Sequence, residues 1–302
     1  MVKKKSLLHT VVTSILLVGW LFLSAACGGD DRPDPGYVFP PPPKDNVKKP
    51  RYIWIDAAAN FPDFANNREN ITRDLKLAKD AGFTDVVVDI RPTSGDILYD
   101  SSVPGSASVK WLGAWIHGVY SKVERTATWD YLQAFIEEGH KLGLKVHAGF
   151  NTMVGGQSNS LGSQGILFRD ASKKEWATSV NLPIGITNTM DAGGGIKFFN
   201  PVNEEVQNHL CDLLKDLARY NLDGIILDRG RFDGMQSDFS ELTRKKFENY
   251  LGNIKLSRFP DDIVPPGATM HQVMALTTYP PFFTKWLEFR AKVIYEFMSK
   301  AR

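Results

Sequence analysis

Residues 223–233 constrain the fold of this chain more than any other stretch. A short apolar run at 224–227, rich in β-branched residues, ends abruptly in Asp228, and Arg229 and Arg231 follow it closely. This pattern is typical of a buried parallel strand that carries charged groups to one rim of a sheet. The two guanidinium groups could hold the carboxylate ionised and oriented for chemistry. The alternative interpretation is a cluster of surface ion pairs.

Three earlier segments have the same character. We expect strands at Tyr52–Asp56, Asp85–Arg91 and Lys145–Asn151, each of which ends in polar residues. Apolar residues at helical spacing precede the second, third and fourth strands. Each of these helices ends in a residue that tolerates the left-handed conformation, followed by an apolar residue, at 81–83, 142–144 and 220–222. This helix ending recurs at irregular spacing, which indicates β-α units with variable loops and argues against a solenoid.

The long segments of the chain follow the predicted strands. Residues 92–127 and 152–199 connect strand to helix, whereas the turns from helix to strand are short. Asn200 and Pro201 have the residue types of a helix start. After the fourth strand we expect an inserted helix near 239–251 and an outer helix at 282–301. The pattern predicts an α/β fold, the N-terminal half of a (β/α)₈ barrel with parallel strands and long loops after strands 2, 3 and 4.

The predicted barrel domain, residues 50–302, is incomplete by this interpretation. Four β-α units leave two strand edges unpaired and an apolar face uncovered, which favours aggregation. If the reading frame continues past Arg302, we expect a strand within a few residues, closed by an acidic residue. If the native protein ends there, we expect a poorly soluble and inactive domain. A natural four-stranded open sheet is the alternative.

Several polar residues end the predicted strands and should meet at one rim. Carboxylates that share a pocket with arginines suit glycoside hydrolysis, in which one carboxylate attacks or stabilises an oxocarbenium-like centre and another group donates a proton. Asp228 is the candidate nucleophile or stabiliser. Trp111 and Trp115, in the long loop after the second strand, could stack on sugar rings. The remaining candidates for substrate binding are Asp56, Asp89, Arg91, His147, Asn151, Arg229 and Arg231.

Structural roles compete with these assignments. Asp56 could cap the loop that follows it, and His147, in the middle of its strand, could be a hydrogen-bonded core histidine. Asp85 and Asp223 begin their strands, so we assign them to the opposite rim. We expect two tryptophans, Trp54 and Trp286, to pack in the core, and His140 and Cys211, on predicted helices, to have no catalytic role.

Composition excludes several classes of function. The formal net charge is +2, with no basic tract beyond the N-terminus, so we expect no nucleic-acid partner. The two cysteines, Cys27 and Cys211, lack partners at metal-ligand spacing, so the sequence implies no disulfide framework and no zinc site. We predict no cofactor.

The N-terminus predicts export and lipidation. Lysines at 3–5 precede an apolar segment at 7–23, and small residues then lead to Cys27. Residues 1–27 are therefore interpreted as a lipoprotein signal peptide with the lipidated cysteine at its end, and the alternative is an uncleaved membrane anchor. Residues 28–49, which include a run of prolines, read as an extended tether. The expected partners are a membrane, through the lipid on Cys27, and a carbohydrate substrate.

Four segments together resemble a known family. They are Tyr52–Asp56, the run from Asp85 to Gly95, Phe199-Asn200-Pro201 with its helix, and the run from Asp223 to Gly234. They look like the family-10-like glycosyl-hydrolase-like lipoproteins of Bacteroidetes, often labelled alpha-amylase-family proteins. The resemblance covers roughly 50–302. It implies a TIM barrel with its site at the carboxyl ends of the strands.

The resemblance also implies roles for single residues. It places Asp228 at the nucleophile position of the amylase-like superfamily. The superfamily's general acid is expected at the end of a fifth strand, which this sequence does not reach. Acidic residues soon after Cys27, Asp30 and Asp31, resemble those of lipoproteins exported to the outer membrane or cell surface.

The leading hypothesis is thus a glycoside hydrolase anchored outside the cytoplasm. Two alternatives stay open. One is a lipoprotein that binds carbohydrate without turnover, using the loop aromatics. The other is a different TIM-barrel hydrolase, acting on peptidoglycan glycan strands or using a metal at Asp56 and Asp89.

Overall fold

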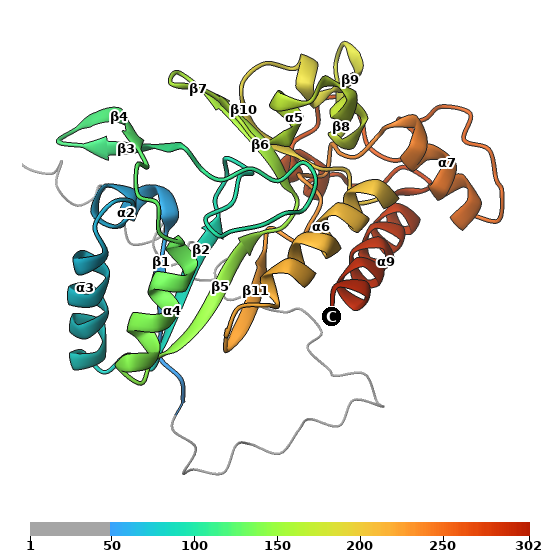
Figure 1. Cartoon of the computed structure of the whole chain (residues 1–302). Helices are drawn as coiled ribbons and strands as arrows, with labels where there is room; N and C mark the ends of the chain where they lie inside the picture. Colours follow the sequence, from blue (N-terminus) through green and yellow to red (C-terminus); the bar gives the residue numbers. More distant parts are fainter. Residues whose placement is uncertain (1–48) are drawn as a thin grey trace, which may run out of the picture. The chain divides into compact units, whose positions relative to one another are not determined.

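A parallel sheet forms the centre of the computed structural model, which describes residues 49–302. Its strands run in the order β1-β2-β5-β11 (Figure 1), which confirms the predicted strands and their parallel direction. The strands are β1 (Tyr52–Ile55), β2 (Asp85–Arg91), β5 (Lys145–Asn151) and β11 (Gly224–Asp228). The fold is mixed α/β, and within these residues the sheet is open at β1 and β11. The expected signal peptide, Cys27 and the tether up to residue 48 lie outside the described residues.

Helices cover one face of this sheet. α3 (Arg68–Asp80), α4 (Tyr131–Lys141) and α6 (Glu204–Leu217) lie on the same side of the strands (Figure 1). Alternate residues of the central strands enter the core beneath them, and each fully buried aliphatic or phenylalanine side chain contributes about 1.5–3 kcal/mol. The strand residues of this core are Ile55, Val86, Val88, Ile90, Val146, Ala148 and Phe150.

The opposite face of the sheet is sparsely covered. Tyr52 is 51% exposed and Trp54 is 44% exposed, so the expectation that Trp54 packs in the core is wrong. Trp54 lies across Gly149, where an added Cβ atom would meet its ring at 3.1 Å. Trp54 points to this face because side chains alternate along a strand, and its neighbours Ile53 and Ile55 contact the helix-covered core.

The start of α6 differs from the expectation. The helix begins at Glu204, and its cap is Asn203, whose side chain accepts a hydrogen bond from the Glu205 amide at 2.9 Å. Asn200 is instead buried and donates to the Asp238 carboxylate at 2.6 Å. A buried charged acceptor outcompetes the local capping role, because an unpartnered buried carboxylate is strongly unfavourable.

The long connections are built largely from antiparallel β-structure that the sequence did not predict. They lie at the end of the sheet where the parallel strands terminate (Figure 1), as expected for the long loops after β2 and β5. β3 (Trp111–Ile116) pairs with β4 (Val119–Glu124) after β2. After β5, the additional strands are β6 (Val154–Asn159), β7 (Gly162–Gln164), β8 (Ser179–Leu182), β9 (Gly185–Asn188) and β10 (Gly195–Phe198).

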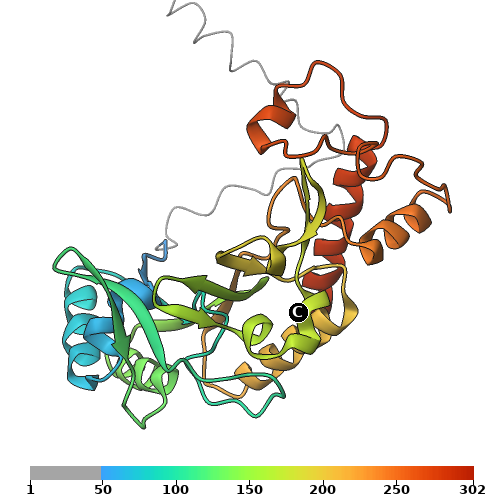
Figure 2. The same cartoon turned by 90° about the horizontal axis from the view of Figure 1, so that it is seen from above.

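Side-chain hydrogen bonds join the insertions after β2 and β5 to each other. Gln164 Nε2 donates to the Trp111 carbonyl at 2.7 Å, and the Thr93 hydroxyl donates to Gln157 Oε1 at 2.8 Å. Seen from above (Figure 2), the β3–β4 hairpin and the C-terminal helices lie on opposite sides of the insertion after β5. The two long loops therefore form one connected layer over the strand ends.

The C-terminal part has a second apolar core. Trp286 is fully buried, as predicted, and stacks on Phe239 at a centroid distance of 5.2 Å. The expected late helices are observed as α7 (Glu241–Tyr250) and α9 (Phe283–Ala301). The short helices of the described chain are α2 (Ala57–Phe64), α5 (Ile166–Arg169) and α8 (Met270–Met274). No helix between residues 49 and 302 is both long and apolar enough to cross a bilayer.

Asp238 joins this second core to the insertion after β5. Its buried carboxylate accepts hydrogen bonds from the Ser179 amide at 2.5 Å, from Asn200 Nδ2 at 2.6 Å and from the Thr243 hydroxyl at 2.5 Å. Ser240, the N-cap of α7, also donates to it. One side chain thus holds β8, the approach to α6 and the start of α7 together.

We predict that Asp238→Ala lowers the free energy of unfolding by about 2–4 kcal/mol, because it leaves buried donors without an acceptor. Urea denaturation measures this change. The control is Asp261→Ala, an exposed aspartate on the following loop, which should shift stability by less than about 0.5 kcal/mol. Equal effects of the two substitutions would show that the network does not hold these segments together.

Candidate active site at the carboxyl ends of the strands

Strand pairing brings the main acidic candidates to one rim. Asn151 pairs with Asp228, and Asp89 pairs with Gly149, two residues before Asn151. Asp56 directly follows β1. The charges of Asp56 and Asp228 both act on the carboxyl group of Asp89. The prediction that these four residues come together is confirmed.

Asp89 is the buried carboxyl group at this rim, with 6% of its surface exposed. Burial, then the charge of Asp56, raises its pKa to about 7, and the charge of Asp228 adds to this effect. The backbone amides of Ala57 and Arg91 act in the opposite direction. Near neutral pH the Asp89 carboxyl group is therefore partly protonated, unlike an ordinary aspartate.

Asn151 fixes the position of Asp89. Its Nδ2 atom donates to Asp89 Oδ1 at 3.2 Å and to the Arg91 carbonyl at 2.9 Å. The Arg91 amide also donates to Asp89 Oδ1, at 3.3 Å. The Asn151 side chain is thus hydrogen-bonded to the end of β2.

Asp228, like Asp56, is exposed to solvent. Its Oδ1 atom accepts a hydrogen bond from the Arg229 amide at 2.7 Å, and its carbonyl accepts one from the Thr152 amide at 2.8 Å. Arg229 has a φ of 48°, in the left-handed region, so the chain turns sharply directly after the carboxylate. Asp228 is therefore held at the start of a turn with its carboxylate open to solvent.

The expected pairing of Asp228 with the two arginines is not observed in the described part of the chain. The Arg231 guanidinium donates to the Phe232 carbonyl at 3.2 Å and lies over the Phe198 ring at 5.5 Å. The positive charges of Arg231 and Arg229 instead act on Asp233, where they oppose the rise in pKa that burial causes. The arginines belong to the loop that follows the strand, and a backbone amide orients Asp228.

Asp56 has a structural role as well as a place at the rim. Its Oδ1 atom accepts a hydrogen bond from the Ala59 amide at 2.8 Å and caps α2. The capping alternative is therefore confirmed. The same carboxylate adds to the negative field at Asp89.

The expectation that Arg91 lines the rim as a substrate-binding residue differs from the structure, which places Arg91 in the core. A regular register would pair it with Asn151, but a bulge between Asp89 and Arg91 pairs it with Phe150. Its side chain is fully buried, with the guanidinium 5.1 Å from the Phe150 ring and 5.7 Å from the Phe199 ring, and donates to the Asn151 carbonyl. Burial lowers the pKa of Arg91 to about 10, so it stays a buried cation.

His147 lies at the other end of the sheet, so the expectation that it joins the other substrate-binding candidates at the rim is wrong. It pairs with Gly224, the first residue of β11, and its Nε2 atom is 2.8 Å from Asp85 Oδ1. Four residues separate it from Asn151, about 13 Å along a strand. Burial opposes ionisation of Asp85, but hydrogen bonds from Thr84 and His147 hold its pKa below the usual range. Asp223 likewise accepts from the Val146 amide, as expected for the opposite rim.

The two loop tryptophans differ in accessibility. Trp115 is 73% exposed on β3, and its ring lies 5.5 Å from that of Tyr120 on β4. Trp111 is half-buried, with Lys122 Nζ 4.5 Å from its ring centroid. Trp115 therefore offers an open aromatic surface, whereas Trp111 is partly covered.

Tyr131 is a neighbour of the site that sequence reasoning missed. It is fully buried at the start of α4, and its hydroxyl has no hydrogen-bond partner among the described residues. Burial, then the charge of Asp89, raises its pKa, so the hydroxyl keeps its proton. An aromatic residue in the first turn of a helix carries no local signal of such a neighbour.

Within residues 49–302, the structure contains no group of three or more histidine, cysteine, aspartate or glutamate side chains placed to hold a metal ion. Asp56 and Asp89 are engaged by backbone amides. Their arrangement suits proton and charge chemistry.

We predict that Asp89→Asn changes the pH dependence of stability. The folded-state pKa of about 7 lies above the unfolded value of about 4, so folding binds a proton between these limits. Wild-type stability should therefore fall as pH rises from 4 to 7, by up to about 4 kcal/mol. Asn carries no titrating proton and should remove this loss.

Urea unfolding at pH 5 and pH 8 measures the difference. Between pH 5 and pH 8, the free energy of unfolding should fall more in the wild type than in Asp89→Asn. Asp63→Asn, which alters an exposed aspartate on α2, is the control and should follow wild type. A parallel pH dependence of wild type and Asp89→Asn would contradict the assigned protonation.

Comparison with known proteins identifies the family. A model of the family described as glycosyl hydrolase-like 10 matches residues 49–302. An S-layer-related protein of Niallia circulans is 30% identical over 294 residues, which are 94% of this chain and 17% of that protein. The chain thus spans only a small part of that relative's length.

Two solved structures are similar at low identity. One is an alpha-L-fucosidase isoenzyme 2 from Paenibacillus thiaminolyticus, with a TM-score of 0.49 and 15% identity, covering 84% of this chain and 31% of that one. The other is a hypothetical protein from Ruminiclostridium thermocellum, with a TM-score of 0.43 and 16% identity, covering 83% and 90%. On the family match over residues 49–302, the chain belongs to the glycosyl hydrolase-like 10 family.

Proposed function

We propose that this protein hydrolyses O-glycosidic bonds of a poly- or oligosaccharide outside the cytoplasm, with Asp228 as the nucleophile or electrostatic stabiliser. Family membership supports the reaction class. The observation that carries the proposal is the pair formed by exposed Asp228 and buried Asp89 at one rim, whose charges interact. Two carboxyl groups in contrasting environments are the arrangement that glycoside hydrolysis uses.

The two carboxyl groups have different roles in this proposal. Asp228 is open to solvent, and the Arg229 amide orients it, so its free oxygen can approach an anomeric carbon. Asp89 holds a proton for part of the time near neutral pH, which reduces the repulsion between neighbouring carboxylates. Asn151 keeps Asp89 in place. When protonated, Asp89 therefore places no negative charge beside Asp228, and in this proposal it acts as a positioning residue.

The sheet would form part of a (β/α)₈ barrel in this proposal. Tyr52, Trp54 and Asp228 lie on the face that lines the interior of such a barrel, and Tyr52 and Trp54 are both more than two-fifths exposed. The edge strand β11 keeps Ile225 37% exposed. The layer of insertions over the strand ends matches the place where barrel enzymes carry their sites.

The proposed location is the outer membrane or cell surface, through a lipid on Cys27. The charged and apolar segments before Cys27 support export. The proline-rich tether would separate the domain from the lipid.

Carbohydrate binding without turnover is a second candidate. The 73% exposed ring of Trp115, beside Tyr120, favours it, because a flat aromatic surface binds a sugar ring whether or not a carboxylate attacks it. Trp115 fits both functions. Turnover distinguishes them.

We predict that Asp228→Asn in the complete gene product lowers kcat by about 10³-fold or more on a hydrolysed glycan, with KM little changed. Asn keeps the shape of the side chain and removes the nucleophilic charge. Release of reducing sugar from a panel of glycans measures the effect, with Asp261→Asn as the control. Undiminished turnover in Asp228→Asn would remove the catalytic assignment. Glycan binding without hydrolysis by either protein would favour the binding function.

We predict that Cys27→Ser moves the protein from the detergent phase to the aqueous phase in detergent partition, because the lipidated thiol is lost. Cys211→Ser, which alters the buried cysteine of α6, should still partition into detergent. If Cys27→Ser stays in the detergent phase with its N-terminal segment uncleaved, the anchor is that segment and the lipoprotein assignment fails.

A further inference from the structure

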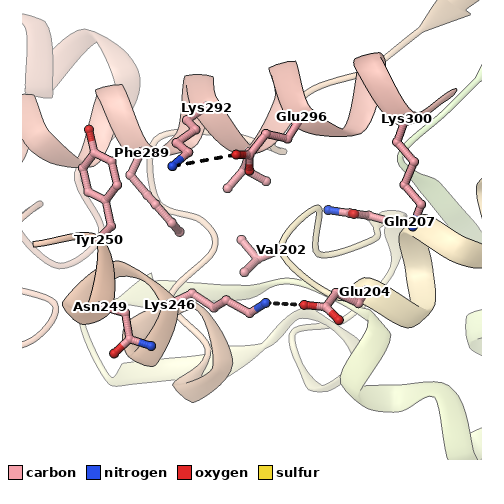
Figure 3. Close-up of a pocket in the computed structure, with 11 residues that line it drawn as sticks. Val202, Glu204, Gln207, Lys246, Asn249, Tyr250, Phe289, Lys292, Glu296 and Lys300 are labelled. Carbon is pink, nitrogen blue, oxygen red and sulfur yellow. Dashed lines mark hydrogen bonds and ion pairs between the residues drawn. The ribbon is translucent and has the colours of Figure 1, made fainter. Parts of the chain in front are cut away.

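A cleft lies between the helices, apart from the strand ends. It has a volume of about 490 Å³ and is bounded by the start of α6, the end of α7 and the length of α9 (Figure 3). This volume falls in the usual range of small-ligand sites. None of the candidate active-site residues lines it.

The floor of this helical cleft is apolar. Val202, Phe289 and Val293 are each less than a tenth exposed. Tyr250 forms one end, with its ring 5.6 Å from that of Phe289. An aromatic end beside an apolar floor suits the C–H face of a sugar ring.

The walls of the cleft carry charged side chains that face each other (Figure 3). On one wall, Lys246 and Glu204 form a tight pair at 2.5 Å. On the other wall, Lys292, Glu296 and Lys300 follow one another at four-residue intervals along α9, so they share one face of the helix. Each wall therefore offers both donors and acceptors to a polar ligand.

The charges do not balance. The lining contains Lys246, Lys292 and Lys300 against Glu204 and Glu296, a surplus of one positive charge. The Lys292–Glu296 pair is loose, at 3.7 Å, with both side chains more than half exposed, so it contributes little. Lys300 donates to Asn208 Oδ1 at 2.5 Å, a neutral partner. The α9 wall therefore presents ammonium groups that an anionic ligand can engage.

We propose that the helical cleft is a second glycan-binding site, for a sugar that carries a carboxylate. The sugar ring rests on the apolar floor beside Tyr250. Glu204, Glu296 and the exposed Asn249 amide accept and donate hydrogen bonds to its hydroxyl groups. Lys292 and Lys300 bind the carboxylate. An acidic peptide is the competing ligand, and the family to which the chain belongs favours the sugar.

The test is titration calorimetry of the purified protein with trigalacturonate, maltotriose and triglutamate. We expect trigalacturonate to bind, with an affinity that falls at least tenfold in Lys292→Ala/Lys300→Ala. Lys285→Ala is the matched control, because Lys285 lies on α9 outside the cleft, and it should bind as wild type does. The single variant Lys300→Arg, with Lys292 unchanged, should retain binding, because arginine keeps the positive charge at position 300. Thermal melts establish that each variant is folded.

Asp228→Asn separates this site from the strand ends. Trigalacturonate binding should be unchanged in Asp228→Asn, whether or not the protein hydrolyses any glycan. Loss of binding in Asp228→Asn with retention in the double lysine variant would overturn the proposal, as would absence of trigalacturonate binding. Equal binding of maltotriose would overturn the role of the carboxylate, and tighter binding of triglutamate would assign the cleft to a peptide.

Discussion

The hydrogen-bonded register of three parallel strands is the constraint on which the candidate site depends. β5 pairs with β2 on one side and β11 on the other, which sets Asp89 opposite Gly149 and Asn151 opposite Asp228. Because parallel strands end at a common edge, backbone pairing alone brings residues 89, 151 and 228 together from distant parts of the chain. A shift of one residue would turn either carboxylate to the helix-covered face.

Burial then makes the gathered carboxyl groups different from one another. Asp89 is buried and its pKa is raised to about 7, whereas Asp228 lies at a turn and is open to solvent. Holding a carboxylate in a buried, negatively charged place lowers stability, and proteins tolerate this mainly at functional sites. The apolar core beneath the sheet and the Asp238 network, which anchors the neighbouring segments, offset this loss.

Local patterns in the sequence predict the parallel strands and the principal helices. Strands such as Asp85–Arg91 are apolar runs with turn signals at both ends, and buried helices show a clear 3.6-residue period. The location of the long loops, and with it the rim where Asp89 and Asp228 meet, also follows from sequence. The strands, the helices and the positions of the long loops depend mainly on residues that are close in the sequence.

The predictions that differ from the structure concern residues whose positions depend on contacts with distant parts of the chain. In a regular strand, Arg91 would lie at the rim with Asp89. The bulge between the two residues instead directs the Arg91 side chain into the core. His147 has the strand parity of Asn151 but lies beside Asp85 at the far end. Asn200 is a residue type that often caps helices, yet its side-chain amide donates a hydrogen bond to buried Asp238. Bulges and long-range pairs leave no periodic trace in the sequence.

The most direct test of the central claim is a crystal structure of Asp228→Asn, in the complete gene product, with a bound oligosaccharide. If the strand ends form the active site, a sugar ring lies at the rim, with its anomeric carbon about 3–3.5 Å from the side chain at position 228 and Asp89 behind it. Oligosaccharide bound only elsewhere, for example in the cleft between α6, α7 and α9, with the rim free of sugar, would contradict the claim.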